Sequence, residues 1–241
     1  MAKFCVPFAS AGTVYALVGG MDYFKRMFIV AFVVSALALV VAYVAARRVV
    51  ERKPAEEVLW RESIAQLKSL GDHKYRQSLH YMAYAKYAAR DSLNAEAALF
   101  HAMSHADAVH CANCRKALEG LGGKATTPTI SRTRFSSTAD HLRYALEDKN
   151  TLHIHLLQPA IDQALADNNR HIARMLTWCD ASDIKQMLIL RRARSSQPLP
   201  HTYRICPTCG DICWEELSPR HCPHCMTDSA KFIRVHYPYD D

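Results

Sequence analysis

The residues with the clearest chemical meaning are four cysteines near the carboxyl end of the chain. Cys206 and Cys209 form one Cys-x-x-Cys pair, and Cys222 and Cys225 form a second pair after twelve intervening residues. Four thiolates in two such pairs are the ligand set that a tetrahedral zinc or iron ion requires. Two disulfides or two chance pairs are the weaker alternatives. The spacing therefore predicts a metal-binding domain over residues 201–236.

Two further groups of thiol and imidazole side chains lie in the middle of the chain. Cys111 and Cys114 repeat the Cys-x-x-Cys spacing on a predicted helix. We interpret them as buried, inert thiols, with a redox-active dithiol as the alternative. His101 and His105 are spaced to share one helix face and bind a metal, although two exposed histidines are the simpler interpretation.

The composition of the 241-residue chain bears on its partners and on the redox state of its compartment. A formal charge of +7 is modest and spread out, so it does not by itself indicate a nucleic-acid partner. Nine cysteines are present, and those outside the two carboxyl-terminal pairs show no evident disulfide framework. Metal-ligating thiols beside unpaired ones favour a reducing compartment.

A membrane anchor is predicted near the amino terminus. Residues 28–46 form a run of nineteen residues without a charge or a proline, just long enough to cross the hydrocarbon core as a helix. Basic pairs on both sides disfavour a buried soluble helix. A signal peptide is the closer alternative, because residues 44–46 (Val-Ala-Ala) form a small-residue cleavage motif. We favour an uncleaved anchor, since the run is longer than a typical signal core.

The charges around the anchor predict its orientation. More basic residues follow the run than precede it: Arg47, Arg48, Arg52 and Lys53 against Lys25 and Arg26. The positive-inside rule therefore places the carboxyl-terminal bulk of a single-pass membrane protein in the cytoplasm. Residues 1–27 form an amino-terminal segment in which Met21 is an alternative start, and cleavage of the anchor stays open.

Helical periodicity dominates the chain between the anchor and the metal-binding domain. No strand-type alternation occurs before residue 200. Glycine and proline divide the region, with a break at Gly71 and a kink at Pro159. The predicted helices are 56–70, 72–90, 93–118, 139–166 and 171–194. We therefore predict a mainly α protein with a helical bundle over 55–195, arranged as two helix pairs joined by a long crossover, and a linker at 196–200.

Several of these motifs together resemble the rubrerythrin family. The two cysteine pairs and their gap are similar to its carboxyl-terminal rubredoxin-like domain. The helical motifs that resemble its bundle are Gly71-Asp72, Met82-Ala83, Ala97-Ala98-Leu99-Phe100, Asp107-x-x-His110 and Thr138-Ala139-Asp140-His141-Leu142. The resemblance covers about residues 56–236. It implies a ferritin-like four-helix bundle that holds two iron ions, followed by a rubredoxin-like domain with a four-cysteine metal site.

The resemblance assigns a partial set of metal ligands to the bundle. Asp72 falls on the first-helix glutamate position, and Asp107 with His110 falls on the second-helix Glu-x-x-His motif. Asp183 falls on the fourth-helix glutamate. Aspartate is one methylene shorter than glutamate but is still a hard oxygen donor, so these residues form a candidate remnant of the metal site.

The same matching of positions shows where the sequence departs from the family. Lys149 and Leu152 fall where the third helix should supply carboxylates, and Gln186 replaces the fourth-helix histidine. An ammonium group at Lys149 would put a positive charge where a cation should sit, and could replace it by pairing with Asp72, Asp107 or Asp183. Three outcomes stay open for the bundle: a di-iron centre, a single metal at Asp72, Asp107 and His110, or a polar cluster without metal.

The resemblance implies an oxidoreductase of the peroxidase type. Electrons would pass from a redox partner through one iron in the four-cysteine site to a di-iron centre that reduces hydrogen peroxide, in a homodimer where one chain's rubredoxin-like domain reaches the other's bundle. The alternative is a non-catalytic scaffold, tethered to membrane lipid, in which the four cysteines hold structural zinc for partner binding. A zinc ribbon that contacts nucleic acid ranks last, since no basic and aromatic cluster accompanies the cysteines.

Overall fold

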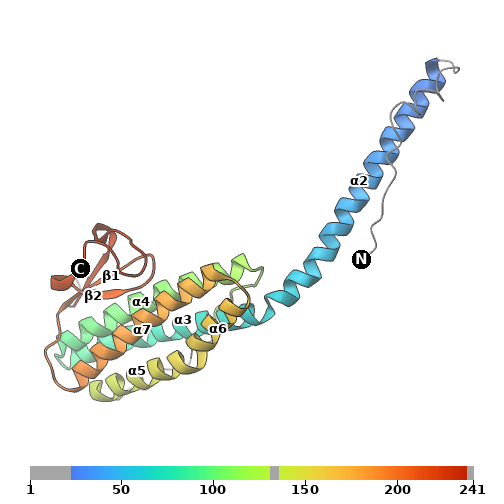
Figure 1. Ribbon diagram of the computed structural model, residues 1–241. Helices are drawn as coiled ribbons and strands as arrows, with labels where there is room; N and C mark the ends of the chain where they lie inside the picture. The colour runs from blue at the N-terminus through green and yellow to red at the C-terminus, as the bar shows by residue number, and fades with distance from the viewer. Residues whose placement is uncertain (1–22, 131–135, 238–241) are drawn as a thin grey trace. The chain divides into compact units, whose positions relative to one another are not determined.

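The computed structural model describes residues 23–130 and 136–237 (Figure 1). The chain divides into two compact units, Met1–Glu56 and Glu57–Asp241. The amino-terminal segment up to residue 22, including the alternative start at Met21, lies outside the described residues.

The first unit contains most of one long helix, α2, which spans Tyr23–Leu59. Its segment Met27–Arg47 has a mean hydropathy of 2.8 and buries none of its side chains within the chain. By length and composition this segment is able to cross a membrane, although an amino-terminal signal sequence would have the same properties. The predicted apolar helix is therefore present.

The second unit begins with a bundle of long helices. The helices are α3 (Arg61–Arg90), α4 (Asn94–Gly120), α5 (Thr138–Leu152), α6 (Gln158–Ala166) and α7 (Arg170–Arg194). Short turns join α3 to α4 and α6 to α7, and a longer connection separates the two helix pairs, as the sequence predicted. Ser137 and Asn169 cap α5 and α7, because each side-chain oxygen accepts a hydrogen bond from a first-turn amide.

Helix α3 runs straight through Gly71, where the sequence predicted a break. The glycine serves close packing instead of ending the helix. A Cβ atom added at Gly71 would lie 3.3 Å from Cβ of Cys114 on α4. The absence of a side chain at this position therefore lets α3 and α4 approach closely.

The kink predicted at Pro159 takes the form of a π-helical turn. The turn, η1, spans His153–Leu157 and separates α5 from α6. Pro159 has no amide to donate, and the amide of Gln158 bonds back to the carbonyl of His153, five residues earlier. The extra residue places His153 beside Asp180 of α7, with Nδ1 at 2.6 Å from the carboxylate.

A small three-stranded antiparallel sheet follows the bundle. Its strands are β1 (Thr202–Ile205), β2 (Ile212–Trp214) and β3 (Ile233–His236), in the order β2-β1-β3. Two 3-10 turns complete the domain: η2 (Glu215–Leu217) and η3 (Ser229–Lys231). The first cysteine pair lies between β1 and β2, and the second lies between β2 and β3. We call this sheet with its cysteine loops the four-cysteine domain.

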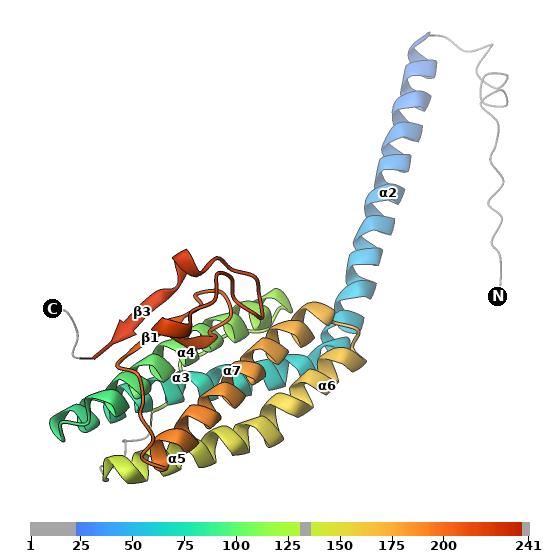
Figure 2. The ribbon, with the colours of Figure 1, turned by 60° about the vertical axis from the view of Figure 1, so that its left-hand side comes forward.

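The sheet shares a hydrophobic core with the bundle. Tyr203, Ile205 and Ile212 are fully buried against α4 and α7, together with Val235. Figure 2 shows the strands lying along α4, close to α7. Full burial of an isoleucine side chain stabilises a fold by about 1.5–3 kcal/mol. The four-cysteine domain is therefore docked on its own chain's bundle by substantial apolar contact.

Candidate metal centres

The four cysteines of the carboxyl-terminal domain converge on one point. Sγ of Cys206 lies 3.4 Å from Sγ of Cys225, and Sγ of Cys209 lies 3.4 Å from Sγ of Cys222. All four sulfur atoms lie within 4.8 Å of one another, and all four thiols are free of disulfides. Three of the cysteines are buried and Cys225 is partly exposed. This arrangement matches the tetrahedral thiolate set that binds one iron or zinc ion.

Backbone amides line the sulfur cluster. The amides of Thr208 and Cys209 donate to Cys206, and those of His224 and Cys225 donate to Cys222. Donated hydrogen bonds stabilise the thiolate form that a metal requires.

The loops can adopt this shape because the residue after each pair has a positive φ. Gly210 follows the first pair with φ 76°, and Met226 follows the second with φ 62°. Both loops therefore have the same turn, although the second lacks the glycine that normally favours it. Together with the convergent sulfurs and the amide donors, this shows that the residues present fit a bound metal.

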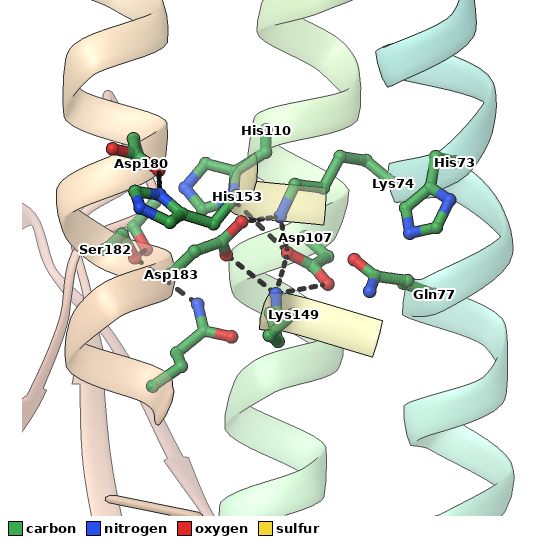
Figure 3. A network of polar contacts seen from close by, with 12 residues as sticks. His73, Lys74, Gln77, Asp107, His110, Lys149, His153, Asp180, Ser182 and Asp183 are labelled. Atoms are coloured by element: carbon green, nitrogen blue, oxygen red, sulfur yellow. Dashed lines mark hydrogen bonds and ion pairs between the residues drawn. The ribbon is translucent and has the colours of Figure 1, made fainter. Parts of the chain in front are cut away.

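The second candidate centre is a buried cluster of four charged side chains in the middle of the bundle. Asp107 of α4 and Asp183 of α7 face one another, and Lys74 of α3 and Lys149 of α5 lie on either side of them (Figure 3). Nζ of Lys149 is 2.9 Å from both oxygens of Asp107 and 2.7 Å from Asp183. Nζ of Lys74 is 2.9 Å from Asp107 and also bonds Asp183. All four side chains are completely buried.

The charges in this cluster stabilise one another. Burial alone would raise the pKa of Asp107, but the ammonium groups of Lys149 and Lys74 outweigh it and hold that pKa well below its usual range. The same balance lowers the pKa of Asp183. Burial alone would lower the pKa of Lys74, but the two carboxylates raise it well above 10.5. Both acids and Lys74 are therefore charged at neutral pH.

His110 connects this cluster to the four-cysteine domain. Its Nδ1 is 3.3 Å from Asp107, and burial lowers the pKa of the imidazole, so that the ring is neutral at neutral pH. Its Nε2 is buried and, within the described residues, has no hydrogen-bond partner. A Cβ atom added at Gly210 would lie only 2.4 Å from this nitrogen, and Ser182 Oγ donates to the Gly210 carbonyl at 2.9 Å. The first cysteine loop is thus pressed directly against the buried cluster.

The structure brings together three of the four bundle residues that the resemblance assigned. Donor atoms of Asp107, His110 and Asp183 lie within 4.8 Å of one another. Asp72 lies outside this group and pairs instead with Lys68 on the preceding turn of α3, at 2.8 Å. Of the pairings suggested for Lys149, those with Asp107 and Asp183 are present.

Lys74 was missed from the sequence, although a signal was available. It continues the apolar stripe of α3 that includes Leu67, Leu70 and Tyr81, all of them buried. A lysine inside such a stripe must find a carboxylate partner, since an unpaired buried charge is strongly unfavourable.

The side chains in the centre of the bundle do not fit the pair of metal ions that the fold family implies. Each carboxylate that would hold a cation already accepts hydrogen bonds from both ammonium groups. A divalent cation added to the cluster would face two buried positive charges at ion-pair distance. The first and third helices supply lysines where carboxylate ligands are required, and Gln186, which replaces the fourth-helix histidine, is a poor ligand.

The remaining candidates from the sequence have structural roles. Cys111 and Cys114 are buried, and burial raises the pKa of Cys114 to about 12, so this thiol is inert at neutral pH. The simpler interpretation of two exposed histidines is wrong for His101, which is buried beneath β3 with Nδ1 at 3.4 Å from the carbonyl of His236. Its Nε2 is 3.1 Å from Nε2 of His105.

Comparison with known proteins places the fold. No family model matches the chain, and no curated protein matches it. Among solved structures, nigerythrin in its fully reduced, all-ferrous state aligns with a TM-score of 0.65 at 19% identity, covering 71% of this chain and 86% of that one. Nigerythrin in its mixed-valence state gives a TM-score of 0.64 at the same identity and coverage.

A more distant likeness involves a ferritin. An open-pore ferritin from the archaeon Archaeoglobus fulgidus aligns with a TM-score of 0.50 at 10% identity, covering 56% of this chain and 83% of that one. At these identities the comparisons establish the fold alone. They confirm the predicted resemblance at that level: a ferritin-like helical bundle, as in nigerythrin of the rubrerythrin family, with a carboxyl-terminal cluster of four cysteines that fits a rubredoxin-like domain.

Proposed function

We propose that this protein is a membrane-tethered, rubredoxin-type metalloprotein that binds one metal ion at its four carboxyl-terminal cysteines and uses the ferritin-like bundle as a metal-free support. One contrast carries the proposal. The sulfurs of the four-cysteine site converge and accept hydrogen bonds from backbone amides, whereas two ammonium groups lie between the carboxylates of the bundle. Iron bound by the four thiolates supplies one-electron transfer, while zinc there supplies structural stability only.

Iron is the metal that the comparisons favour, because the nigerythrin structures are described as ferrous or of mixed valence. The chain's own residues then have two tasks. The amides that donate to Cys206 and Cys222 stabilise negative charge on the sulfurs and so tune the reduction potential. Cys225, the most exposed of the four, provides the edge through which a redox partner would exchange an electron.

The bundle holds the four-cysteine domain in a fixed position. Asn113 of α4 donates to the carbonyl of Thr208 at 2.9 Å, and Lys185 of α7 pairs with the buried carboxylate of Asp211. These contacts lie within one chain, so we propose that the four-cysteine domain does not need a second copy to dock. A homodimer that exchanges these domains is the alternative, and light scattering of the purified protein would distinguish a monomer from a dimer.

The tether is assigned to the segment Met27–Arg47. This segment of 21 residues buries none of its apolar side chains against any other described part of the chain, so a lipid environment is the partner that its composition fits. The basic residues that follow it favour a cytoplasmic bundle. Alkaline carbonate extraction and protease protection of the full-length chain in inverted vesicles test both points. Release into the soluble fraction would contradict the tether, and protection of the bundle inside these vesicles would reverse the orientation.

Peroxide reduction is the second candidate function. The ferritin-like fold and the convergence of Asp107, His110 and Asp183 favour it. The two buried lysines oppose it, because they compete directly for the carboxylates that would hold the catalytic metals. A non-catalytic zinc scaffold for partner binding is the remaining alternative, and it shares the single metal at the four cysteines with our proposal.

Metal analysis of the full-length protein distinguishes these functions. Protein made in iron-replete cells is expected to contain about one iron per chain and to show the visible absorption of a ferric tetrathiolate site. About one zinc per chain without visible absorption would identify the scaffold. About three irons per chain with turnover of hydrogen peroxide would overturn our proposal in favour of the peroxidase.

A further inference from the structure

The buried lysines of the bundle stand in the place of metal ions, and we propose that their ammonium groups are built-in counter-cations that take over the charge balance of a metal pair. This inference rests on the proposal that the bundle of the natural protein is metal-free. It adds that Asp107, His110 and Asp183 form a latent divalent-metal site, which the two lysines mask.

The pattern of replacement is the first argument. The bundle consists of two similar halves, each with one helix that carries a lysine and one that carries a two-residue motif. Lys74 precedes Asp107-x-x-His110, and Lys149 precedes Asp183-x-x-Gln186. All of these residues are buried. Each half therefore contributes one buried lysine, and both lysines pair with the same two aspartates. A single chance substitution would not produce this repeated arrangement.

The geometry is the second argument. Each carboxylate bonds both lysines, and each lysine bonds both carboxylates. Asp107 and Asp183 thus bridge two ammonium groups, as two carboxylates can bridge a pair of metal ions. Each ammonium group carries one positive charge where a divalent metal ion would carry two. Two negative and two positive charges leave the cluster neutral without an ion from solution. The lysines are covalently attached, so a chelator cannot remove them.

The third argument is a polar atom that the lysine network does not use. Nε2 of His110 is buried and has no hydrogen-bond partner in the described part of the chain, although Nδ1 is held by Asp107. An imidazole nitrogen is a common metal ligand, and one ring nitrogen of His110 lies within 4.8 Å of a carboxylate oxygen of each aspartate. With the ammonium groups gone, this ring and the two aspartates offer one nitrogen and two oxygens to a cation.

Substitution of both lysines by methionine in the full-length protein tests the proposal. Methionine keeps much of the side-chain length and apolar stem but removes the positive charge. Mn²⁺ is the probe, since it prefers oxygen and imidazole ligands and competes poorly for the four cysteine thiolates. Mn²⁺ titration followed by electron paramagnetic resonance is expected to show no tight site in the wild-type bundle and about one tight site per chain in Lys74→Met/Lys149→Met.

The same variant is expected to melt at a lower temperature than wild type in the presence of chelator, and to recover at least half of that loss when Mn²⁺ is added. Adding His110→Ala should abolish both the tight site and the recovery. Lys68→Met is the matched control, because Lys68 is on the same helix but its ion pair with Asp72 is partly exposed. It should change neither Mn²⁺ binding nor the melting temperature with Mn²⁺.

Three results would overturn the proposal: tight Mn²⁺ binding by the wild-type bundle, a folded double variant that binds none, or recovery that survives His110→Ala. If the double variant does not fold, Lys149→Met alone serves in the same assay, because it frees Oδ2 of Asp107 and Oδ1 of Asp183 while Lys74 still bonds the other two oxygens. Mn²⁺ binding no tighter than that of wild type would then overturn the proposal. The metal of the four-cysteine site is measured in every sample. Its absence would contradict the proposed function, whereas an absent Mn²⁺ site with the four-cysteine metal present would contradict this inference alone.

Discussion

Replacing Lys149 by methionine should strongly destabilise the protein. Nζ of Lys149 makes three hydrogen bonds to Asp107 and Asp183, at 2.9, 2.9 and 2.7 Å, and all three side chains are fully buried. The substitution leaves two buried carboxylates with only Lys74 to balance them. Breaking a buried ion pair by removing one partner costs about 3–5 kcal/mol of unfolding free energy.

This cost can be measured by thermal denaturation of the metal-loaded full-length protein. For a domain of this size a loss of 1 kcal/mol lowers the melting temperature by about 2–4 °C, so the expected decrease is about 6–20 °C. The partly exposed pair of Lys68 and Asp72 provides the comparison. Lys68→Met should cost no more than about 1 kcal/mol, because an ion pair that solvent reaches contributes little.

A second variant separates charge from packing. Lys149→Met with Asp183→Asn removes one negative charge along with the positive one and so restores neutrality. We expect the double variant to be more stable than Lys149→Met alone by about 1–3 kcal/mol, because it no longer leaves a buried carboxylate without a compensating partner. A decrease of less than about 1 kcal/mol for Lys149→Met, or a double variant less stable than the single one, would refute the assigned charge balance.

Three further predictions concern the docking of the four-cysteine domain and the buried titratable groups. Gly210→Ala should lower the melting temperature by several degrees, because φ is 76° and the new methyl group would lie 2.4 Å from Nε2 of His110. Gly120→Ala is the control, since nothing lies within 4 Å of a Cβ atom there. An effect of Gly210→Ala no larger than that of the control would show that the close approach is unimportant. Cys114 should resist iodoacetamide at pH 8 in the folded protein and react after denaturation, because burial raises its pKa to about 12. Labelling of Cys114 itself in the native protein, located by peptide mapping, would disprove its burial. Burial lowers the pKa of His101 from 6.5 to about 4, so the unfolded chain binds the proton more readily, and stability should fall as pH decreases between these values. His101→Gln should flatten this part of the stability profile, measured by urea denaturation at each pH. An unchanged slope would contradict the lowered pKa.

The four-cysteine site could be predicted from the sequence because its information is local. Two Cys-x-x-Cys pairs fix the ligands within a few residues of each other, and a glycine after the first pair indicates the turn. Met226 shows the limit of that reasoning. Its φ of 62° repeats the conformation of Gly210 without a glycine, so the surrounding structure holds a backbone shape that the residue type does not favour.

The bundle site could be predicted only in part, because its geometry depends on helix phase and on contacts between helices. The sequence predicted a helix break at Gly71, and the family resemblance assigned Asp72 as a metal ligand. In the structure α3 is continuous, and Asp72 lies on a different face of the helix from Lys74, which contacts the cluster. Lys149 was identified from its own position, but only the packing of four helices shows that each lysine contacts both aspartates.

Other differences between sequence and structure have a similar physical origin. The three strands have only three or four residues each, too few to produce a clear alternating pattern. His101 is buried because β3 covers α4, which no feature of the helix alone could indicate. The π-helical turn at His153–Leu157 results from Pro159, and the sequence predicted the kink without its form.

The most direct test of the whole account is the metal content of full-length protein in which Cys206 and Cys225 are both replaced by serine. The four thiolates are the proposed metal site of this chain, and the bundle carries lysine ammonium groups where the fold family carries cations. We predict that the variant, purified from iron-replete cells, contains essentially no iron or zinc while its helical content is retained. Retention of about two irons per chain would contradict the account, because it would place a metal pair in the bundle despite Lys74 and Lys149.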